Sequence, residues 1–342
     1  MSSRMLAETR AAPALIRAML AQDEAAYRAL ALALRQRPPA FVVTVARGSS
    51  DHAATYLASL IGIAAGRITA SLPPSLVTRY AAPLSFAGAF VLALSQSGAS
   101  PDLVRTLSAA KAGGALAAAI VNHADSPLAA TVEHVLPQRA GAETSVAATK
   151  SMLATMACGA RLVAAWSEDA ALAAALPLLP ERLEAALACD WSAALPALAT
   201  ASRLYVVGRG PGLGVALETA LKLKETSGLL AEALSAAEIQ HGPKAVIGPG
   251  FPVLVYGLGD PGGQDAAAFA AELAAGGAEV LLAGGAPGAS VPITLPLPAP
   301  LHPLLDPIVA LQAFYPLAEA LARRRGRDPD RPPGLRKVTR TV

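Results

Sequence analysis

The sequence predicts an α/β fold built from two similar domains, each with a parallel β-sheet flanked by helices. Short apolar runs alternate with longer helical patterns along the chain, which is typical of βαβ units and parallel sheets. At 342 residues, the chain is long enough for two ordinary domains. The order strand, Arg-Gly turn and helix occurs at residues 45–50 and again at 207–212, which indicates an internal repeat.

The first half of the chain contains a helical lead and a set of predicted strands. An Ala-rich amphipathic pattern runs over about residues 8–36 and ends at Arg37-Pro-Pro39, because proline lacks the amide N–H that a helix needs and restricts the residue before it. Polar turns and helical patterns separate the apolar runs that follow. The strands expected here cover residues 41–45, 89–94, 116–121 and 132–136.

The second half repeats this alternation, with strands expected at 203–208, 251–256 and 280–283 and a last helix over about 304–325. Prolines interrupt the helical stretch between the halves, at Pro177, Pro180 and Pro196, and make it the predicted boundary. The predicted organisation is a helical lead over 1–36, a first domain over 37–166, a connector over 167–200, a second domain over 201–326 and a tail over 327–342.

Composition and charge argue against several classes of function. The net charge is +3, from 28 basic and 25 acidic residues, and their scatter along the chain gives little support for a nucleic-acid partner. The one basic cluster, Arg323-Arg324-Arg325, is expected to be a solvated helix end. Cys158 and Cys189 lack the spacing of metal ligands, so we expect neither a metal nor another cofactor.

The N-terminal sequence and the hydropathy predict a cytoplasmic protein without a membrane partner. Residues 1–10 lack the apolar core of a signal peptide. No uncharged apolar run reaches the roughly 20 residues that are needed to span a bilayer.

Small polar residues gather where two predicted strands of the first half end, in Ser49-Ser50 and in Ser95-Gln-Ser-Gly-Ala-Ser100. Ligands of an open parallel sheet collect at the carboxyl ends of its strands, where helix N-termini offer N–H groups to an anion. Helix capping alone would need only one serine per helix, so we favour a phosphate site. Its predicted ligands are Ser50, Ser95, Gln96, Ser97 and Ser100.

A polar stripe on an otherwise Ala- and Leu-rich helix is the most informative feature of the second half. Glu218, Lys222 and Glu225 stand at i, i+4 and i+7, so they share one helical face. With the imidazole of His241 downstream, they supply the groups needed to move protons near a carbonyl. An exposed salt-bridge ladder, worth roughly a few tenths of a kcal/mol per pair, and a capped turn at His241 would explain each part separately. Their joint occurrence favours catalysis.

Two further segments admit both a structural and a functional interpretation. The segment from Glu143 to Lys150 is expected to begin a helix, and capping explains its small polar residues as well as a role in lining a sugar pocket does. Lys337 lies in a polar, Pro-rich tail, which composition alone predicts to be solvated and disordered.

Together these segments resemble the double sugar-isomerase (SIS) domain proteins. The matching segments are Ser95–Gly98, Ser145–Lys150, Ala216–Glu225, Ala231–Pro243 and, in the tail, Gly334–Thr339. The chain looks most like the isomerase half of glucosamine-6-phosphate synthase and the stand-alone glucosamine-6-phosphate deaminases. The resemblance covers nearly the whole chain and implies two SIS domains, each a flavodoxin-like three-layer sandwich.

The resemblance implies that the five predicted phosphate ligands hold the phosphate of a small-molecule sugar substrate. The residues implied to line the rest of the pocket are Arg47, Gly48, Ser49, Ser145 and Ala147. Arg47 stands where the family has a cysteine, so we expect it to alter the choice of substrate.

The catalytic residues implied by the resemblance are Glu225, His241, Lys337, Glu218 and Lys222. Glu225 would move a proton between C1 and C2 of the open-chain sugar, while Glu218 and Lys222 organise the pocket. His241, donated by the neighbouring subunit of a homodimer, would act in ring opening. Lys337 would meet the sugar carbonyl as the tail closes over the site and excludes water.

The expected activity is conversion of glucosamine 6-phosphate into fructose 6-phosphate and ammonia. The synthase releases ammonia from glutamine with a cysteine at its start, and no cysteine lies near Met1, so no glutaminase activity is expected. One alternative is a deaminase or deglycase for another phosphosugar, such as galactosamine 6-phosphate or fructosamine 6-phosphate. The other is a non-catalytic sugar-phosphate sensor, which would need the serines but not Glu225, His241 and Lys337 together.

Overall fold

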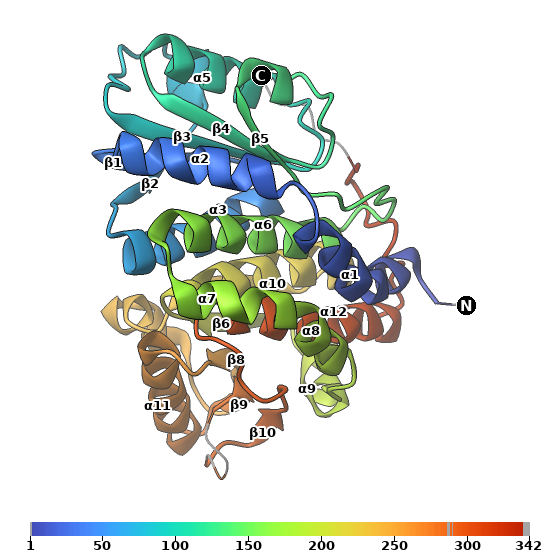
Figure 1. Ribbon diagram of the computed structural model, residues 1–342. Coiled ribbons are helices and arrows are strands. Elements are labelled where there is room, and N and C mark those ends of the chain that lie inside the picture. The colour runs from blue at the N-terminus through green and yellow to red at the C-terminus, as the bar shows by residue number, and fades with distance from the viewer. Residues whose placement is uncertain (1, 286–287, 289, 338–342) are drawn as a thin grey trace. The chain divides into compact units, whose positions relative to one another are not determined.

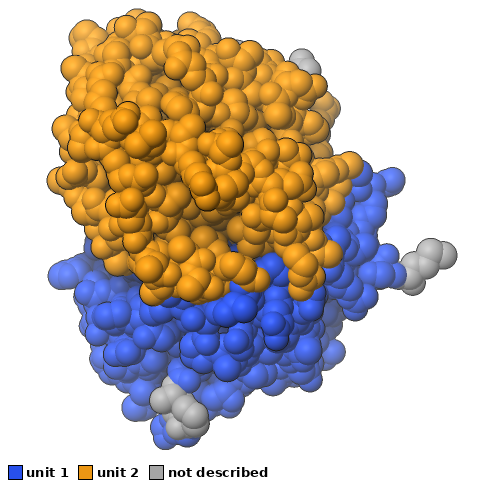
Figure 2. Space-filling view, viewed as in Figure 1, with its two compact units in different colours: residues 1–13, 144–149, 178–335 blue, residues 14–143, 150–177, 336–342 orange. Residues whose placement is uncertain are grey.

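The computed structural model describes residues 2–285, 288 and 290–337, and these residues form two compact units. Of the described residues, unit 1 takes those in 1–13, 144–149 and 178–335, and unit 2 takes those in 14–143, 150–177 and 336–342 (Figure 2). Each unit is therefore completed by segments that are distant in sequence. No helix among the described residues is long and apolar enough to cross a membrane.

Unit 2 contains a five-stranded parallel sheet in the order β2-β1-β3-β4-β5. Its strands are β1 (Phe41–Val45), β2 (Thr69–Ser71), β3 (Ala89–Ser95), β4 (Leu116–Val121) and β5 (His134–Pro137). All but β2 lie where the sequence predicts strands. The pattern misses β2 because this edge strand has three residues, none of them buried, and so shows no apolar run.

Helices cover both faces of this sheet (Figure 1). One face, with Val43 and Val91, forms a core with Leu103 and Leu107 of α5. On the other side, α6 packs against both α2 and α3. The helices that lie wholly in unit 2 are α2 (Glu24–Gln36), α3 (Ser49–Leu60), α4 (Ser75–Thr78), α5 (Pro101–Ala112), α6 (Lys150–Ser167) and α7 (Ala170–Ala175), and a π-helical turn, η1 (Ile61–Ala65), extends α3.

The helical lead, predicted as one amphipathic segment, is two helices, α1 (Arg4–Leu20) and α2. They are separated at Asp23, whose backbone is left-handed at φ 59°. The Asp23 carboxylate accepts hydrogen bonds from Arg139, at 2.5 Å from Nε and 2.6 Å from Nη2. Because this partner is distant in sequence, periodicity could not reveal the break.

Unit 1 contains a second five-stranded parallel sheet, in the order β10-β9-β8-β6-β7. Its strands are β6 (Arg203–Gly208), β7 (Leu230–Ser235), β8 (Pro252–Gly257), β9 (Glu279–Gly284) and β10 (Ile293–Leu295). Read from β7, the order is that of unit 2, so both sheets share one topology. The predicted α/β fold with two helix-flanked parallel sheets is confirmed, although the edge strands β7 and β10 were not predicted.

The helices of unit 1 include α10, which carries the predicted charged stripe. α10 packs against β6, β7 and α12, and the last predicted helix is confirmed as α12. The helices of this unit are α8 (Leu179–Leu187), α9 (Leu195–Thr200), α10 (Pro211–Ser227), α11 (Pro261–Ala275) and α12 (Asp306–Arg324), joined by short 3₁₀ turns that include η5 (Glu238–His241).

The expectation of a solvated basic helix end is wrong for Arg325. Its Nη1 donates to the carbonyls of Leu198, Ala199 and Ala201 at 2.9–3.0 Å, and its Nε donates to the carbonyl of Ser227 at 2.9 Å. These carbonyls belong to the C-terminal ends of α9 and α10, where the last helical C=O groups lack intrahelical partners. One guanidinium therefore joins the ends of three helices.

We expect Arg325→Ala to lower the free energy of unfolding by about 1–3 kcal/mol, because charge-assisted hydrogen bonds to these helix ends are lost. Denaturant unfolding followed by circular dichroism measures the change. Arg324→Ala is the matched control, since Arg324 is exposed and its loss should change the stability by less than about 0.5 kcal/mol. Equal effects of the two substitutions would contradict the capping role of Arg325.

Candidate active site

The two serine-bearing loops of unit 2 leave the same edge of the sheet. β1 and β3 are neighbouring parallel strands, and Val45 pairs with Ala93 at their carboxyl ends. The loop after β1 leads into α3, and the loop after β3 leads into α5. Two helix N-termini and the predicted phosphate ligands therefore meet at one edge, as expected for a ligand site in a parallel sheet.

The hydroxyl groups in these loops do little conventional helix capping. Ser95 ends β3 and accepts a hydrogen bond from the Gly98 amide at 3.0 Å, while Ser97 accepts one from Ala99 at 3.3 Å. Ser100 occupies the N-cap position of α5, but its side chain accepts no hydrogen bond from the first turn, which the structure describes in full. Ser50 and Gln96 are partly exposed. Capping therefore does not account for the cluster, and its role in phosphate binding remains a prediction.

Three of the predicted pocket residues, Arg47, Gly48 and Ser49, lie in the turn between β1 and α3. Gly48 has φ 55° and ψ −133°, in the region of positive φ that glycine reaches without strain. The turn exposes Arg47 and Gly48, while Ser49 is half-buried.

Glu143 is a buried carboxylate of unit 2, in the segment that was expected either to begin a helix or to line a sugar pocket. The helix instead begins seven residues later, at Lys150. Glu143 accepts hydrogen bonds from the Ser151 amide at 3.1 Å and from its hydroxyl at 2.6 Å. An acid at this end of α6 also suits the helix dipole. The expected helix start was wrong because the carboxylate caps α6 from outside it.

The same carboxylate binds Lys337. Lys337 Nζ lies 2.7 Å from Oε2 of Glu143, and the two side chains are 22% and 0% exposed. The interpretation of this part of the tail as solvated is therefore wrong, because a distant ion pair holds the amine. The remaining residues of the matching tail segment, Val338 and Thr339, lie outside the described residues.

Ser145 and Ala147, also predicted to line the pocket, belong to unit 1 and are fully buried. The Ser145 amide lies 3.3 and 3.4 Å from the two carboxylate oxygens of Glu8 in α1. Val146 donates to the carbonyl of Asp330 at 3.3 Å. These contacts fix residues 145–147 between the N-terminal helix and the tail, and their place in a pocket stays a prediction.

Asp330 also anchors the tail within unit 1. Its carboxylate accepts hydrogen bonds from the Arg4 and Met5 amides at 2.9 and 2.7 Å, at the N-terminus of α1. Burial acts to raise the pKa of Asp330, but these two amides and the charge of Arg4 hold it below its ordinary value. The first and last parts of the described chain are thus joined by charge-assisted hydrogen bonds.

The charged stripe on α10 is buried. The side chains of Glu218, Lys222 and Glu225 are 0%, 1% and 19% exposed, and Lys222 Nζ lies 3.4 Å from Glu218 and 2.5 Å from Glu225. An exposed salt-bridge ladder is therefore the wrong interpretation. Burial alone would lower the pKa of Lys222, but the two carboxylates hold it above its ordinary value of 10.5. Lys222 is thus a buried cation between two acids, with Glu225 partly open.

His241 lies in the same unit but is exposed. It ends the 3₁₀ turn η5, which follows the edge strand β7, and the next residue, Gly242, has φ 133°. An exposed imidazole on a tight turn can reach another molecule, although its donation to a neighbouring subunit stays a prediction.

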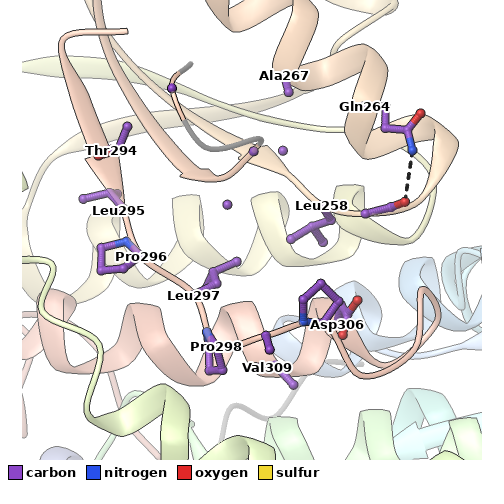
Figure 3. A pocket seen from close by; sticks show the side chains of 17 residues that line it. Leu258, Gln264, Ala267, Thr294, Leu295, Pro296, Leu297, Pro298, Asp306 and Val309 are labelled. Atoms are coloured by element: carbon purple, nitrogen blue, oxygen red, sulfur yellow. Dashed lines mark hydrogen bonds between the residues drawn. The ribbon is translucent and has the colours of Figure 1, made fainter. Parts of the chain in front are cut away.

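A cavity of about 850 Å³ lies at the carboxyl edge of the unit 1 sheet (Figure 3). Its wall is mostly glycine, proline and leucine, and none of the predicted site residues lines it. The side-chain amide of Gln264 donates a hydrogen bond to the Gly259 carbonyl at 3.3 Å, and the Asp306 carboxylate accepts one from the Leu301 amide at 2.8 Å. Burial raises the pKa of Asp306. The chemistry of this cavity therefore differs from that of the serine loops.

The SIS domain model matches residues 40–165 and 197–282. The chain belongs to the SIS domain family. It is 34% identical to a glutamine–fructose-6-phosphate aminotransferase of Zymomonas mobilis over 275 residues, and this alignment covers 76% of this chain and 45% of that protein. An aminotransferase of the same name from Aeropyrum pernix is 33% identical, and the alignment covers 87% of this chain and 50% of that protein. The SIS chain thus spans about half the length of these curated relatives.

Several solved structures share the fold along nearly the whole chain. A candidate phosphosugar isomerase from Silicibacter pomeroyi superposes with a TM-score of 0.90 at 41% identity, covering 96% of this chain and 100% of that one. The C-terminal domain of glucosamine-fructose-6-phosphate aminotransferase from Francisella tularensis gives 0.85 at 23% identity, with 97% and 98% covered. Glucosamine-6-phosphate deaminase from Thermotoga maritima gives 0.75 at 20% identity, with 99% and 100% covered.

We expect Lys222→Met to lower the free energy of unfolding at pH 8 by about 3–5 kcal/mol, because removal of one partner leaves buried carboxylates without their cation. Denaturant titration at pH 8 measures the effect. Lys224→Met, on the exposed side of the same helix, is the control and should change the stability little.

The wild-type protein should lose the stability that Lys222 contributes only at high pH. The pKa of Lys222 is raised on folding, so its contribution to stability is fully present below pH 10.5 and is lost as the pH rises through the raised value. A stability difference between wild type and Lys222→Met that disappears already at pH 8 would contradict the buried cation.

Proposed function

We propose that this SIS protein is an aminosugar-phosphate deaminase that converts glucosamine 6-phosphate and water into fructose 6-phosphate and ammonia. The observation that carries the proposal is the buried Glu218–Lys222–Glu225 stripe. A cation between two carboxylates inside a unit costs desolvation energy that a purely structural helix would avoid. Only Glu225 of the three is partly open, as a proton-transfer group must be.

The phosphate end of the substrate would bind at the carboxyl edge of the unit 2 sheet. The hydroxyls of Ser50, Ser95, Ser97 and Ser100 and the Gln96 amide supply neutral hydrogen-bond donors there. The first turns of α3 and α5 add backbone N–H groups and the positive ends of two helix dipoles. A phosphate dianion suits this set better than a carboxylate does, because it offers more acceptor oxygens.

The proton transfer would proceed on the open-chain sugar. Glu225 takes the proton from C2 as O1 gains a proton, which gives an enolamine. It then returns a proton to C1 as the nitrogen loses one, which leaves an imine at C2. Water adds to this imine and displaces ammonia, so the product carries the C2 ketone of fructose 6-phosphate. Lys222, with its raised pKa, remains protonated throughout and orients Glu225 through the 2.5 Å contact. Glu218 balances its charge.

Two further groups complete the proposed mechanism. His241 would assist ring opening, and its exposure supports donation to the site of a second subunit in a homodimer. Lys337 would meet the sugar carbonyl from its position on Glu143. The tail would then close over the substrate and keep bulk water away from the enolamine, while the one water that adds to the imine is held in the site.

The relatives support the class of substrate. The curated relatives are named for amino transfer to fructose 6-phosphate, the product that we propose. The chain spans about half of their length, so their full reaction is not transferred to it. When free ammonia is the amine donor, the isomerase part of such a reaction is the reverse of deamination. The residues proposed above would supply its phosphate site and its proton transfer.

Glu225→Gln should abolish ammonia release from glucosamine 6-phosphate, by about 10³-fold or more, because an amide cannot carry the proton. Binding of the sugar phosphate, measured by calorimetry, should persist. The control is Glu279→Gln at the amino-terminal end of β9, which should leave turnover unchanged. A Glu225→Gln variant with wild-type turnover would exclude the assigned role.

A panel of phosphosugars tests the substrate itself. We expect ammonia release from glucosamine 6-phosphate to exceed that from galactosamine 6-phosphate and fructosamine 6-phosphate, measured with purified protein at equal concentrations. Faster release from either of the others would assign the activity to that sugar. Tight binding of all three without ammonia release would instead identify a sensor.

A further inference from the structure

An ion pair links the two loops of unit 2 on which the predicted phosphate ligands lie. Arg47, in the turn after β1, donates from Nε and Nη2 to Oδ2 of Asp102, both at 3.1 Å. Asp102 is the second residue of α5 and is 1% exposed, whereas the Arg47 side chain is 47% exposed. The pair therefore joins the loop after one strand to the helix that follows the neighbouring strand.

The linked loops have separate backbone turns. The first turns at Gly48, with φ 55°, and the second at Gly98, with φ 60°. Gly98 is closely packed, because a Cβ there would meet Ser126 Oγ at 2.1 Å. The two strands are paired up to Val45 and Ala93, and beyond that point the Arg47–Asp102 contact bridges the loops. A phosphate that binds to both loops requires their separation to be fixed.

The corresponding loops of unit 1 carry a comparable pair. Gly210, before α10, has φ 55° and ψ −131°, which matches Gly48 before α3 at 55° and −133°. Arg209 precedes Gly210 as Arg47 precedes Gly48, and its Nη1 lies 3.0 Å from Oδ2 of Asp265 in α11. An arginine in the first loop thus reaches an aspartate of the second helix in both repeats.

The serines, in contrast, occur in one repeat only. The strand registers align the end of β3 with the end of β8. Residues 95–97, Ser-Gln-Ser, then correspond to residues 257–259, Gly-Leu-Gly. The arginine–aspartate pair of unit 1 therefore bridges loops without the hydroxyl set, which makes it an internal control for the pair of unit 2.

We propose that Arg47 is a positioning residue that acts through Asp102 to hold the two phosphate-binding loops at the separation required by the substrate. This inference rests on the proposed function, because it concerns the same phosphate site. Both bonds from the guanidinium end on one oxygen of a buried carboxylate, and the planar group fixes their direction. Lysine cannot reproduce this, since its ammonium has no fixed donor plane. Removal of either partner frees one loop relative to the other.

The experiment measures binding of inorganic phosphate and of fructose 6-phosphate to the full chain by calorimetry. We expect Arg47→Ala, Asp102→Asn and the double variant each to weaken binding by about 10- to 100-fold, because small displacements of positioned groups have effects of this size. The double variant should bind no more weakly than the single variant with the larger loss of affinity, which is the signature of two residues acting as one unit. Arg47→Lys should fall between Arg47→Ala and wild type.

Hydrogen exchange of the ligand-free protein provides a second readout. Arg47→Ala should speed exchange of the amides at residues 96–100, in the loop that Arg47 does not belong to. The double variant also removes the buried Asp102 charge, so it serves if Arg47→Ala does not fold. Arg209→Ala is the matched control and should leave phosphate binding within about twofold of wild type and exchange at residues 96–100 unchanged.

Three results would overturn the inference, and they are distinguishable. Unchanged binding or unchanged exchange in Arg47→Ala would show that the pair does not position the loops. Wild-type binding in Asp102→Asn with weak binding in Arg47→Ala would show that Arg47 contacts the phosphate itself. Absence of phosphate and fructose 6-phosphate binding in the wild-type protein would remove the proposed phosphate site, and the positioning role with it.

Discussion

The ammonium group of Lys222, held inside unit 1 between Glu218 and Glu225, is the interaction on which the functional interpretation depends. A buried amine without a counterion would tend to lose its proton. Beside the two carboxylates the amine keeps its charge, and the pKa of Lys222 is raised above its ordinary value. α10 packs against β6, β7 and α12, and along this fully described helix only Glu218, Lys222 and Glu225 bring buried or partly buried charges into this packing. The proposed proton transfer depends on this charged edge.

The tail and the N-terminal helix show how distant parts of the chain are fixed by charge. Asp330 binds the first amides of α1 within unit 1, and Lys337 binds Glu143 within unit 2. One carboxylate accepts from amides at a helix N-terminus, and the other accepts from an amine. The chain therefore passes from unit 1 to unit 2 within the six residues between Asp330 and Lys337.

The two repeats share topology and loop geometry but not loop chemistry. The glycines before α3 and α10 have nearly the same dihedral angles, and each loop carries an arginine paired with an aspartate. The loop serines Ser95, Ser97 and Ser100 lie in unit 2, whereas Glu218, Lys222 and Glu225 lie on α10 of unit 1. The repeat thus supplies one scaffold twice, and the two copies carry different side-chain chemistry.

The sequence alone determined the α/β class, the central strands, the internal repeat and the grouping of Glu218, Lys222 and Glu225 on one face, because these follow from local periodicity and turn residues. Edge strands β2, β7 and β10 escaped it, since their pairing depends on a neighbour rather than on an apolar run. Only the tertiary structure decided the burial of the charged stripe, the break at Asp23, the capping by Arg325 and the partners of Lys337 and Arg47. Each of these is set by packing or by a contact between residues distant in sequence, which a local pattern cannot encode.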